Sequence, residues 1–226
     1  MKGVIMDNIA IDGPAGAGKS TIARLAAGKL GFIYVDTGAM YRAMALYFIR
    51  NGIDTEDESA VSAACEDINI SIEYKDGKQE VILNGENVNA FIRTEKVSLV
   101  TSDISKYASV RAKLLGLQRS IAATKNIIMD GRDIGTCVLP DAKTKIYLTA
   151  SADERARRRY KEQKEKGISC DLEKIKQDII KRDEQDMNRK TAPLKQAEDA
   201  VFLDTSDLSV KEAVNAVINI YRTKET

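Results

Sequence analysis

The chain has 226 residues, 31% of them charged, and a formal net charge of +1. A balance this close to neutral excludes the global field that would draw a protein onto nucleic acid or anionic lipid. The sequence contains no histidine, so acid–base chemistry near neutral pH must rely on Lys, Arg, carboxylates or a metal.

A phosphate-binding loop is the first motif along the chain. Residues 13–20 read G-P-A-G-A-G-K-S, between an apolar run and a helical pattern. Gly16 and Gly18 let backbone N–H groups approach phosphate oxygens, and Lys19 supplies a charge for the β- and γ-phosphates. The Ser20 hydroxyl suits Mg²⁺. We therefore predict a nucleotide site made by Gly13, Pro14, Ala15, Gly16, Ala17, Gly18, Lys19, Ser20 and Thr21, with Ser20 as metal ligand.

Short apolar runs recur along the chain, separated mostly by helical patterns. They predict an α/β fold with a five-stranded parallel sheet flanked by helices. The runs are 9–12, 32–36, 126–130, 145–149 and 200–204. Four end in a carboxylate, at Asp12, Asp36, Asp130 and Asp204, where the C-terminal edge of the sheet would bind ligands.

A second anion site is indicated directly after the second run. Asp36-Thr37-Gly38 ends that run, and Tyr41-Arg42 follow one helical turn later. A hydroxyl and an arginine near a helix N-terminus suit a phosphate, and two such sites suit transfer between two phosphorylated molecules. A helix start with Thr37 as its cap explains the same residues.

Residues 67–88 break the α/β rhythm. Apolar and polar residues alternate there, and Asp76-Gly77 and Asn84-Gly85 each supply a two-residue turn. We predict a small antiparallel lobe of about three strands, inserted between helices.

Helical signals follow. The segment 109–123 places Val110, Leu114, Leu117 and Ile121 on one stripe, which predicts core positions. Ser151 with Glu154, and Ser209 with Glu212, fit capping boxes, and Gly31 and Gly167 fall where helices would end.

Charged residues gather in two further segments. Asp130-Gly131-Arg132-Asp133 follows an apolar strand at the ligand-binding edge, although an ion pair that only neutralises itself fits as well. Arg182, Asp186 and Arg189 lie on one helical stripe beside Leu172, Ile175 and Ile179. That position predicts that the charged stripe faces the rest of the protein and binds a ligand.

Residues 155–164 form a basic helix containing Arg155, Arg157, Arg158 and Arg159. A hinged arm could use these arginines to screen phosphates and exclude water. A solvated face explains each of them equally well. Interleaved Glu154, Glu162 and Glu165 and the scarcity of aromatics argue against nucleic-acid binding.

Four segments in this order, with the inserted lobe, resemble the bacterial cytidylate kinase family over nearly the whole chain. They are the loop at 13–21, D-T-G-A-M-Y-R at 36–42, D-G-R-D at 130–133 and R-D-E-Q-D-M-N-R at 182–189. The resemblance implies a nucleoside-monophosphate-kinase fold that transfers a phosphoryl group from ATP to CMP or dCMP with Mg²⁺. It implies a core domain at 1–62 and 104–226, a CMP-binding lobe at 63–103 and an arginine-rich lid at about 153–170.

The resemblance also implies residue roles. The acceptor phosphate is assigned to Thr37, Arg42, Arg132 and Arg189, the cytosine to Ser102, Arg111 and Asp133, and the sugar to Arg182 and Asp186. The implied catalytic residues are Lys19, Arg132, Arg157, Arg158 and Arg189.

Two rival classes share the phosphate loop. A kinase of another nucleoside monophosphate or of a small-molecule hydroxyl has a similar sheet, but a hydroxyl acceptor would need Asp36 or Asp133 as base. The surplus of arginines disfavours that acceptor. A GTPase is disfavoured because the chain has no NKxD or DxxG motif.

Cys65, Cys137 and Cys170 are odd in number and lack metal-ligand spacing, which favours a reducing compartment. Neither a signal-like start nor a membrane-length apolar run is evident. We therefore expect a cytoplasmic monomer that binds small nucleotides and neither nucleic acid nor membrane.

Overall fold

The computed structural model describes residues 6–225, so residues 1–5 of the predicted core range lie outside it. The chain divides into two compact units. One is Ile33–Ile127 together with Met6, and the other combines Asp7–Phe32 with the described residues from Ile128 onward. The role of residues 63–103 as a CMP-binding lobe, and the role of residues from about 153 to 170 as a lid, remain predictions.

The central element is a five-stranded parallel sheet with the order β2-β6-β1-β7-β8, which confirms the predicted fold class. Its strands are β1 (Asn8–Asp12), β2 (Ile33–Asp36), β6 (Ile127–Gly131), β7 (Thr144–Thr149) and β8 (Val201–Asp204). Ile9, Ala10 and Ile11 of β1 are fully buried, as are residues 127–129 of β6. Such continuous apolar runs are typical of parallel strands covered on both faces.

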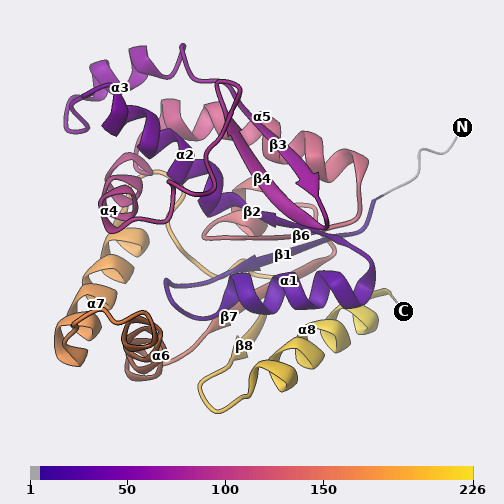
Figure 1. The fold of residues 1–226 in the computed structure, drawn as a ribbon. Helices are drawn as coiled ribbons and strands as arrows, with labels where there is room; N and C mark the ends of the chain where they lie inside the picture. Colours follow the sequence, from indigo (N-terminus) through magenta and orange to yellow (C-terminus); the bar gives the residue numbers. More distant parts are fainter. Residues whose placement is uncertain (1–5, 226) are drawn as a thin grey trace, which may run out of the picture. The chain divides into compact units, whose positions relative to one another are not determined.

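The unit formed by residues 7–32 and 128 onward contains four α-helices and one π-helical turn among its described residues. They are α1 (Lys19–Leu30), η1 (Ile134–Val138), α6 (Ala152–Glu165), α7 (Leu172–Asn188) and α8 (Val210–Glu225). Helices α1 and α8 pack side by side, and α6 and α7 form a second pair (Figure 1). None of the described helices is long and apolar enough to cross a membrane.

The predicted helix ends in this unit are largely confirmed. Before α8, Ser209 and Glu212 bond reciprocally, since Glu212 Oε2 accepts from Ser209 N and Ser209 Oγ accepts from Glu212 N. Ser151 caps Glu154 N at the start of α6, but the Glu154 carboxylate binds Arg158 instead of reaching back. Both glycines that were expected after helices, Gly31 and Gly167, have positive φ.

The unit Ile33–Ile127 contains β2 and four helices. They are α2 (Thr37–Arg50), α3 (Glu58–Ala64), α4 (Glu95–Ile104) and α5 (Ala108–Thr124). The stripe predicted for α5 is partly wrong, because Leu117 and Ile121 are only half-buried. The fully covered stripe is Val110, Leu114, Gln118 and Ala122, at every fourth position. Gln118 is tolerated there because its amide donates to the sulfur of Met40.

The predicted antiparallel lobe is present as the sheet β3-β4-β5. Its strands are β3 (Ile70–Lys75), β4 (Lys78–Leu83) and β5 (Glu86–Asn87). Asp76-Gly77 and Asn84-Gly85 form the two turns, each with positive φ at both residues. That geometry is favoured in two-residue hairpins because its twist matches the strands. Strand β4 also contacts α2.

Candidate active site

The phosphate-binding loop connects β1 to α1. Gly16 and Gly18 have φ of 75° and 88°, a region that only glycine adopts readily. Gly13 is constrained by space as well, because an added Cβ would lie 1.9 Å from the carbonyl oxygen of Leu148 in β7. Both the backbone conformation and the close approach of β7 therefore require the glycines that the motif supplies.

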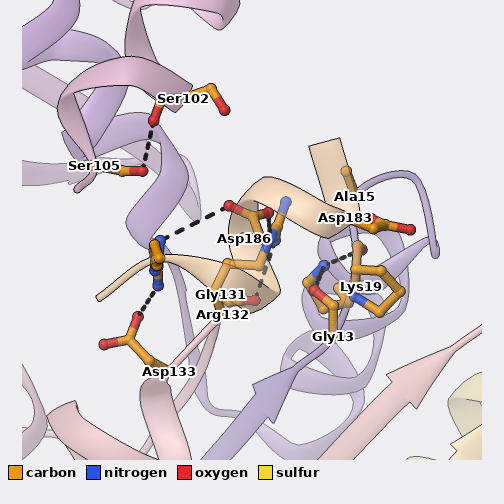
Figure 2. A network of polar contacts seen from close by, with 12 residues as sticks. Gly13, Ala15, Lys19, Ser102, Ser105, Gly131, Arg132, Asp133, Asp183 and Asp186 are labelled. Carbon is orange, nitrogen blue, oxygen red and sulfur yellow. Dashed lines mark hydrogen bonds and ion pairs between the residues drawn. The ribbon is translucent and has the colours of Figure 1, made fainter. Parts of the chain in front are cut away.

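Lys19 turns its side chain back into this loop. Its Nζ donates to the carbonyl oxygens of Gly13 and Pro14, each at 2.7 Å (Figure 2). Burial, and then the charge of Arg132, lower the pKa of Lys19 well below its ordinary value. A bound phosphate would oppose this shift, because a nearby negative charge favours the ammonium form. The lysine is thus positioned inside the loop that the sequence predicted for phosphate.

A pair of oxygen ligands lies at the start of α1. Ser20 Oγ donates to Asp130 Oδ2 at 2.9 Å, which brings the predicted metal ligand against the end of β6. Sequence reasoning placed Asp130 at the ligand-binding edge but did not assign it to a metal. This role could have been predicted from the sequence, because a carboxylate that ends a buried strand opposite a phosphate loop is a usual Mg²⁺ partner.

Asp12 organises the turn that follows β6. Its two carboxylate oxygens accept from Ile134 N and Gly135 N, both at 2.7 Å. Burial raises the pKa of Asp12 to about 6, although these two hydrogen bonds act in the opposite direction. The π-helical turn that begins at Ile134 directly follows Asp133, so Asp12 fixes the backbone beside a predicted cytosine-reading residue.

Two arginines and two aspartates alternate in one network (Figure 2). Arg132 Nε donates to Asp186 Oδ2 at 2.8 Å, and Arg189 Nη2 donates to Asp133 Oδ1 at 3.3 Å. Arg189 also lies 3.8 Å from Asp186. Burial opposes ionisation of Asp186, but the charge and hydrogen bond of Arg132 outweigh it and lower its pKa. The network thus pairs the carboxylates of Asp133 and Asp186 with the guanidinium groups of Arg132 and Arg189.

The charged stripe predicted on α7 therefore faces inward in part. Asp186 is buried and Arg182 is half-buried, whereas Arg189 ends the helix with extended backbone. The apolar side is shifted from the expected one, since Ile175 and Ile179 are buried but Leu172 is 41% exposed.

Asp183 is a buried residue of α7 that sequence reasoning missed. Its Oδ2 accepts from Arg155 Nη1 of α6 at 2.6 Å. Arg155 also donates to the carbonyl oxygens of Ala150 and Ala15, the latter in the phosphate loop. Arg155 is therefore a support for the loop, unlike the arm arginine expected from the sequence.

Arg157 and Arg158, which the sequence analysis treated alike, have different surroundings. Arg158 Nη2 donates to Thr205 O at 2.7 Å, and its Nη1 lies 3.5 Å from Ala17 O of the phosphate loop. The side chain of Arg157 is 63% exposed, and its Nε lies 3.5 Å from Glu154. The structure thus brings Arg158, and not Arg157, to the loop.

The unit Ile33–Ile127 holds a separate cationic cluster at the start of α2. Asp36 caps this helix by accepting from Ala39 N at 2.8 Å, so the predicted capping role of Thr37 is wrong. The same carboxylate binds Arg42 at 3.0 Å and Arg93 at 3.2 Å. Two guanidinium groups on one carboxylate leave an excess of positive charge beside a helix N-terminus. Arg93 was missed, because it lies 51 positions from Arg42 (93 − 42) in an unremarkable segment.

Ser102 and Arg111 belong to this unit as well. Ser102 O accepts from Ser105 Oγ at 2.9 Å, and Arg111 Nη1 lies 3.5 Å from Ser105 O. The Arg111 guanidinium also lies 5.8 Å from the centre of the Tyr41 ring. Two of the three predicted cytosine-reading residues, Ser102 and Arg111, are thus linked through Ser105.

The parallel sheet, the glycine-rich loop and the buried lysine define a P-loop nucleotide-binding protein of the kinase class. The sequence model of the family described as cytidylate kinase matches residues 9–223. The chain belongs to the cytidylate kinase family.

Individual relatives agree with this assignment. A cytidylate kinase from Caldicellulosiruptor bescii is 49% identical over 214 residues, covering 95% of each chain. One from Shouchella clausii is 47% identical over 215 residues, covering 95% of this chain and 96% of the relative. A solved shikimate kinase from Bacteroides thetaiotaomicron covers 98% of this chain and 99% of its own at 14% identity and a TM-score of 0.48, a similarity that carries no functional argument.

Proposed function

We propose that the protein transfers the γ-phosphoryl group of ATP to CMP or dCMP, giving ADP and CDP or dCDP. The observation that carries the proposal is the presence of two independent cationic sites. One is the phosphate loop with Lys19, and the other is the Arg42–Arg93 pair on Asp36. A kinase that phosphorylates a phosphate must bind two polyanions, whereas a kinase of a neutral hydroxyl needs only the first site.

The proposed reaction does not need a protein base. The acceptor phosphate has a second pKa near 6, so its attacking oxygen is already largely deprotonated at neutral pH. The absence of histidine from the sequence fits this requirement. The remaining task is to align two polyanions and offset their repulsion, which positioned cations perform. The oxygen forms a bond to the γ-phosphorus as the bond from that phosphorus to the ADP oxygen breaks.

Mg²⁺ fits the oxygen pair at the start of α1. Ser20 Oγ and the Asp130 carboxylate are hard oxygen ligands 2.9 Å apart, of the type that this ion prefers. These residues would hold it, directly or through water, with the triphosphate supplying further oxygens. The ion would neutralise charge on the triphosphate when bound. Lys19 would add a second positive charge from within the loop.

We assign the other residues as the family resemblance implies. Thr37, Arg42, Arg132 and Arg189 would bind the acceptor phosphate, and Arg182 and Asp186 the sugar. Arg93 joins the first group because it shares the carboxylate of Asp36 with Arg42. Arg158 would stabilise the transferring group from α6, since it already reaches Ala17 O and Thr205 O. Arg157 is assigned with it on the resemblance alone.

Cytosine recognition is proposed for Asp133, with Ser102 and Arg111. The Asp133 carboxylate is buried, and its Oδ1 accepts a hydrogen bond from Arg189 Nη2 at 3.3 Å. An ionised carboxylate accepts a hydrogen bond from the cytosine amino group. Uracil presents an acceptor at that position, so two acceptors would face each other.

A coupled ADP-release assay over a panel of nucleoside monophosphates and non-phosphorylated acceptors tests this function. We expect CMP and dCMP to be the preferred acceptors. Replacing Asp133 by Ala (Asp133→Ala) should reduce the preference for CMP over UMP by about tenfold, since a base-edge contact contributes about 1–3 kcal/mol of discrimination. An unchanged CMP-to-UMP ratio would refute the role of Asp133, and turnover of a sugar instead of CMP would refute the function.

The cellular setting is also proposed. We infer a cytoplasmic protein, because its three cysteines form no disulfide. That the protein is a monomer remains a prediction. Size-exclusion chromatography with light scattering would test the oligomeric state.

A further inference from the structure

Polar side chains of the antiparallel lobe contact both ends of α2, and the contact at its N-terminal end is next to the cationic cluster. On β4, the side-chain amide of Gln79 binds the backbone of Asp36, while on β5 Glu86 binds Arg50 at the other end of α2. The two contacts come from the same lobe and hold the same helix. They therefore allow the effect of the lobe on the cluster to be separated from its effect on stability.

Gln79 makes a paired contact at the last residue of β2. Its Oε1 accepts from Asp36 N at 2.9 Å, and its Nε2 donates to Asp36 O at 3.1 Å. One side chain thus satisfies both backbone groups of the residue, as a neighbouring strand would. Asp36 is the residue whose carboxylate caps α2 and binds both arginines. Holding its backbone fixes the origin of all three interactions.

Gln79 is itself fixed within the lobe. Beyond the short strand β5, Asn89 continues the pairing with β4, because its Nδ2 donates to Gln79 O at 2.9 Å and its Oδ1 accepts from Val81 N at 3.1 Å. The other edge of β4 is paired with β3, where Gln79 is opposite Tyr74. The Gln79 backbone is therefore held from both sides, and its half-buried side chain has little freedom to leave Asp36.

We propose that Gln79 is a positioning residue for the acceptor phosphate, through which the antiparallel lobe orients Asp36 and, with it, Arg42 and Arg93. The proposal rests on the proposed function, because it needs the phosphate to bind at these arginines. Gln79 does not touch the phosphate. Its loss changes the direction in which the two guanidinium groups are presented, and this affects the phosphate group alone among the parts of CMP.

The test compares Gln79→Met with Gln79→Glu. Methionine keeps the length of the side chain and removes both hydrogen bonds. Glutamate keeps the acceptor for Asp36 N but sets a carboxylate oxygen against Asp36 O, and it remains a polar residue suited to a partly exposed site. We expect each variant to raise the KM for CMP by about tenfold, the effect of losing one or two hydrogen bonds. The KM for ATP should stay within twofold of wild type.

Cytidine binding distinguishes an effect on the phosphate site from a general loosening of the protein, because a general loosening would weaken cytidine binding as well. Cytidine carries the base and the sugar of CMP without the phosphate, so its Kd, measured by calorimetry, should be the same in wild type and in both variants. Glu86→Gln is the matched control, because it breaks the exposed Arg50–Glu86 pair and leaves the Asp36 contact intact. Its KM for CMP should equal that of wild type.

The outcomes separate this inference from the proposed function. A wild-type KM for CMP in both Gln79 variants, or an equal weakening of CMP and cytidine, would overturn the role of Gln79. Arg42→Ala tests the site itself, since it removes a direct phosphate contact. If Arg42→Ala also left the KM for CMP unchanged, the acceptor site and the proposed function would be wrong. If only Arg42→Ala raised it, the function would stand without the role of Gln79.

Discussion

The phosphate loop at 13–20 and the cationic cluster at Asp36 hold positive charge by different means. In the loop, glycine backbone and Lys19 provide the site from eight consecutive residues, and Lys19 is buried. In the cluster, Arg42 and Arg93 come from distant segments, and the Arg93 side chain is 69% exposed. A site built from contiguous backbone tolerates few substitutions, whereas one built from side chains can be weakened in steps.

The largest effect is expected at the lysine of the loop. Lys19→Ala removes the one cation of the loop and should lower kcat by about a hundred- to a thousandfold, as losing a preorganised charge contact does in other enzymes. Steady-state ADP release measures it. Lys29→Ala, which removes an exposed lysine of the same helix, should leave kcat unchanged. If Lys19→Ala kept half of the wild-type kcat, the phosphate loop would not be the more sensitive of the two sites, and the contrast with the Asp36 cluster would be wrong.

The next largest effect is expected at Arg155, which supports the phosphate loop, and it should be a loss of stability. Arg155→Met leaves the buried carboxylate of Asp183 without its partner, which costs about 3–5 kcal/mol of unfolding free energy. Urea unfolding followed by circular dichroism would measure this change. Arg159→Met, on the exposed side of α6, should change stability by less than about 0.5 kcal/mol. Adding Asp183→Asn to Arg155→Met should recover part of the loss; equal stability of all four proteins would show that the buried pair supports nothing.

The smallest effect is expected at the exposed arginine of the cluster. Arg93→Ala should raise the KM for CMP by about fivefold with little change in kcat, because a solvent-exposed charge contributes about 1 kcal/mol to binding an anion. Raising the salt concentration should narrow the difference between wild type and variant. Lys96→Ala removes a nearby exposed charge and serves as control. If only the KM for ATP changed, Arg93 would act on ATP binding, which would contradict its assignment to the acceptor phosphate.

The same contrast explains what could be predicted from the sequence. The five parallel strands, the two hairpin turns and the loop were predicted because each depends on neighbouring residues. Arg93 and Gln79 were missed, since their contacts with Asp36 join positions 57 and 43 residues apart. The burial of Arg155 was missed for a similar reason. Its helix reads as a solvated basic face, and only the packing of α7 brings Asp183 to it.

The approach of β7 to Gly13 has an evolutionary consequence. Even alanine would overlap the carbonyl oxygen of Leu148, and a strand in the middle of a sheet cannot move aside as a flexible side chain can. Gly28 and Gly116 have open space where a Cβ would be added. Selection should therefore act unequally on the glycines of this chain. Any of the nineteen other residues at position 13 would overlap β7, whereas substitutions at Gly28 and Gly116 are not limited by contact with neighbouring atoms.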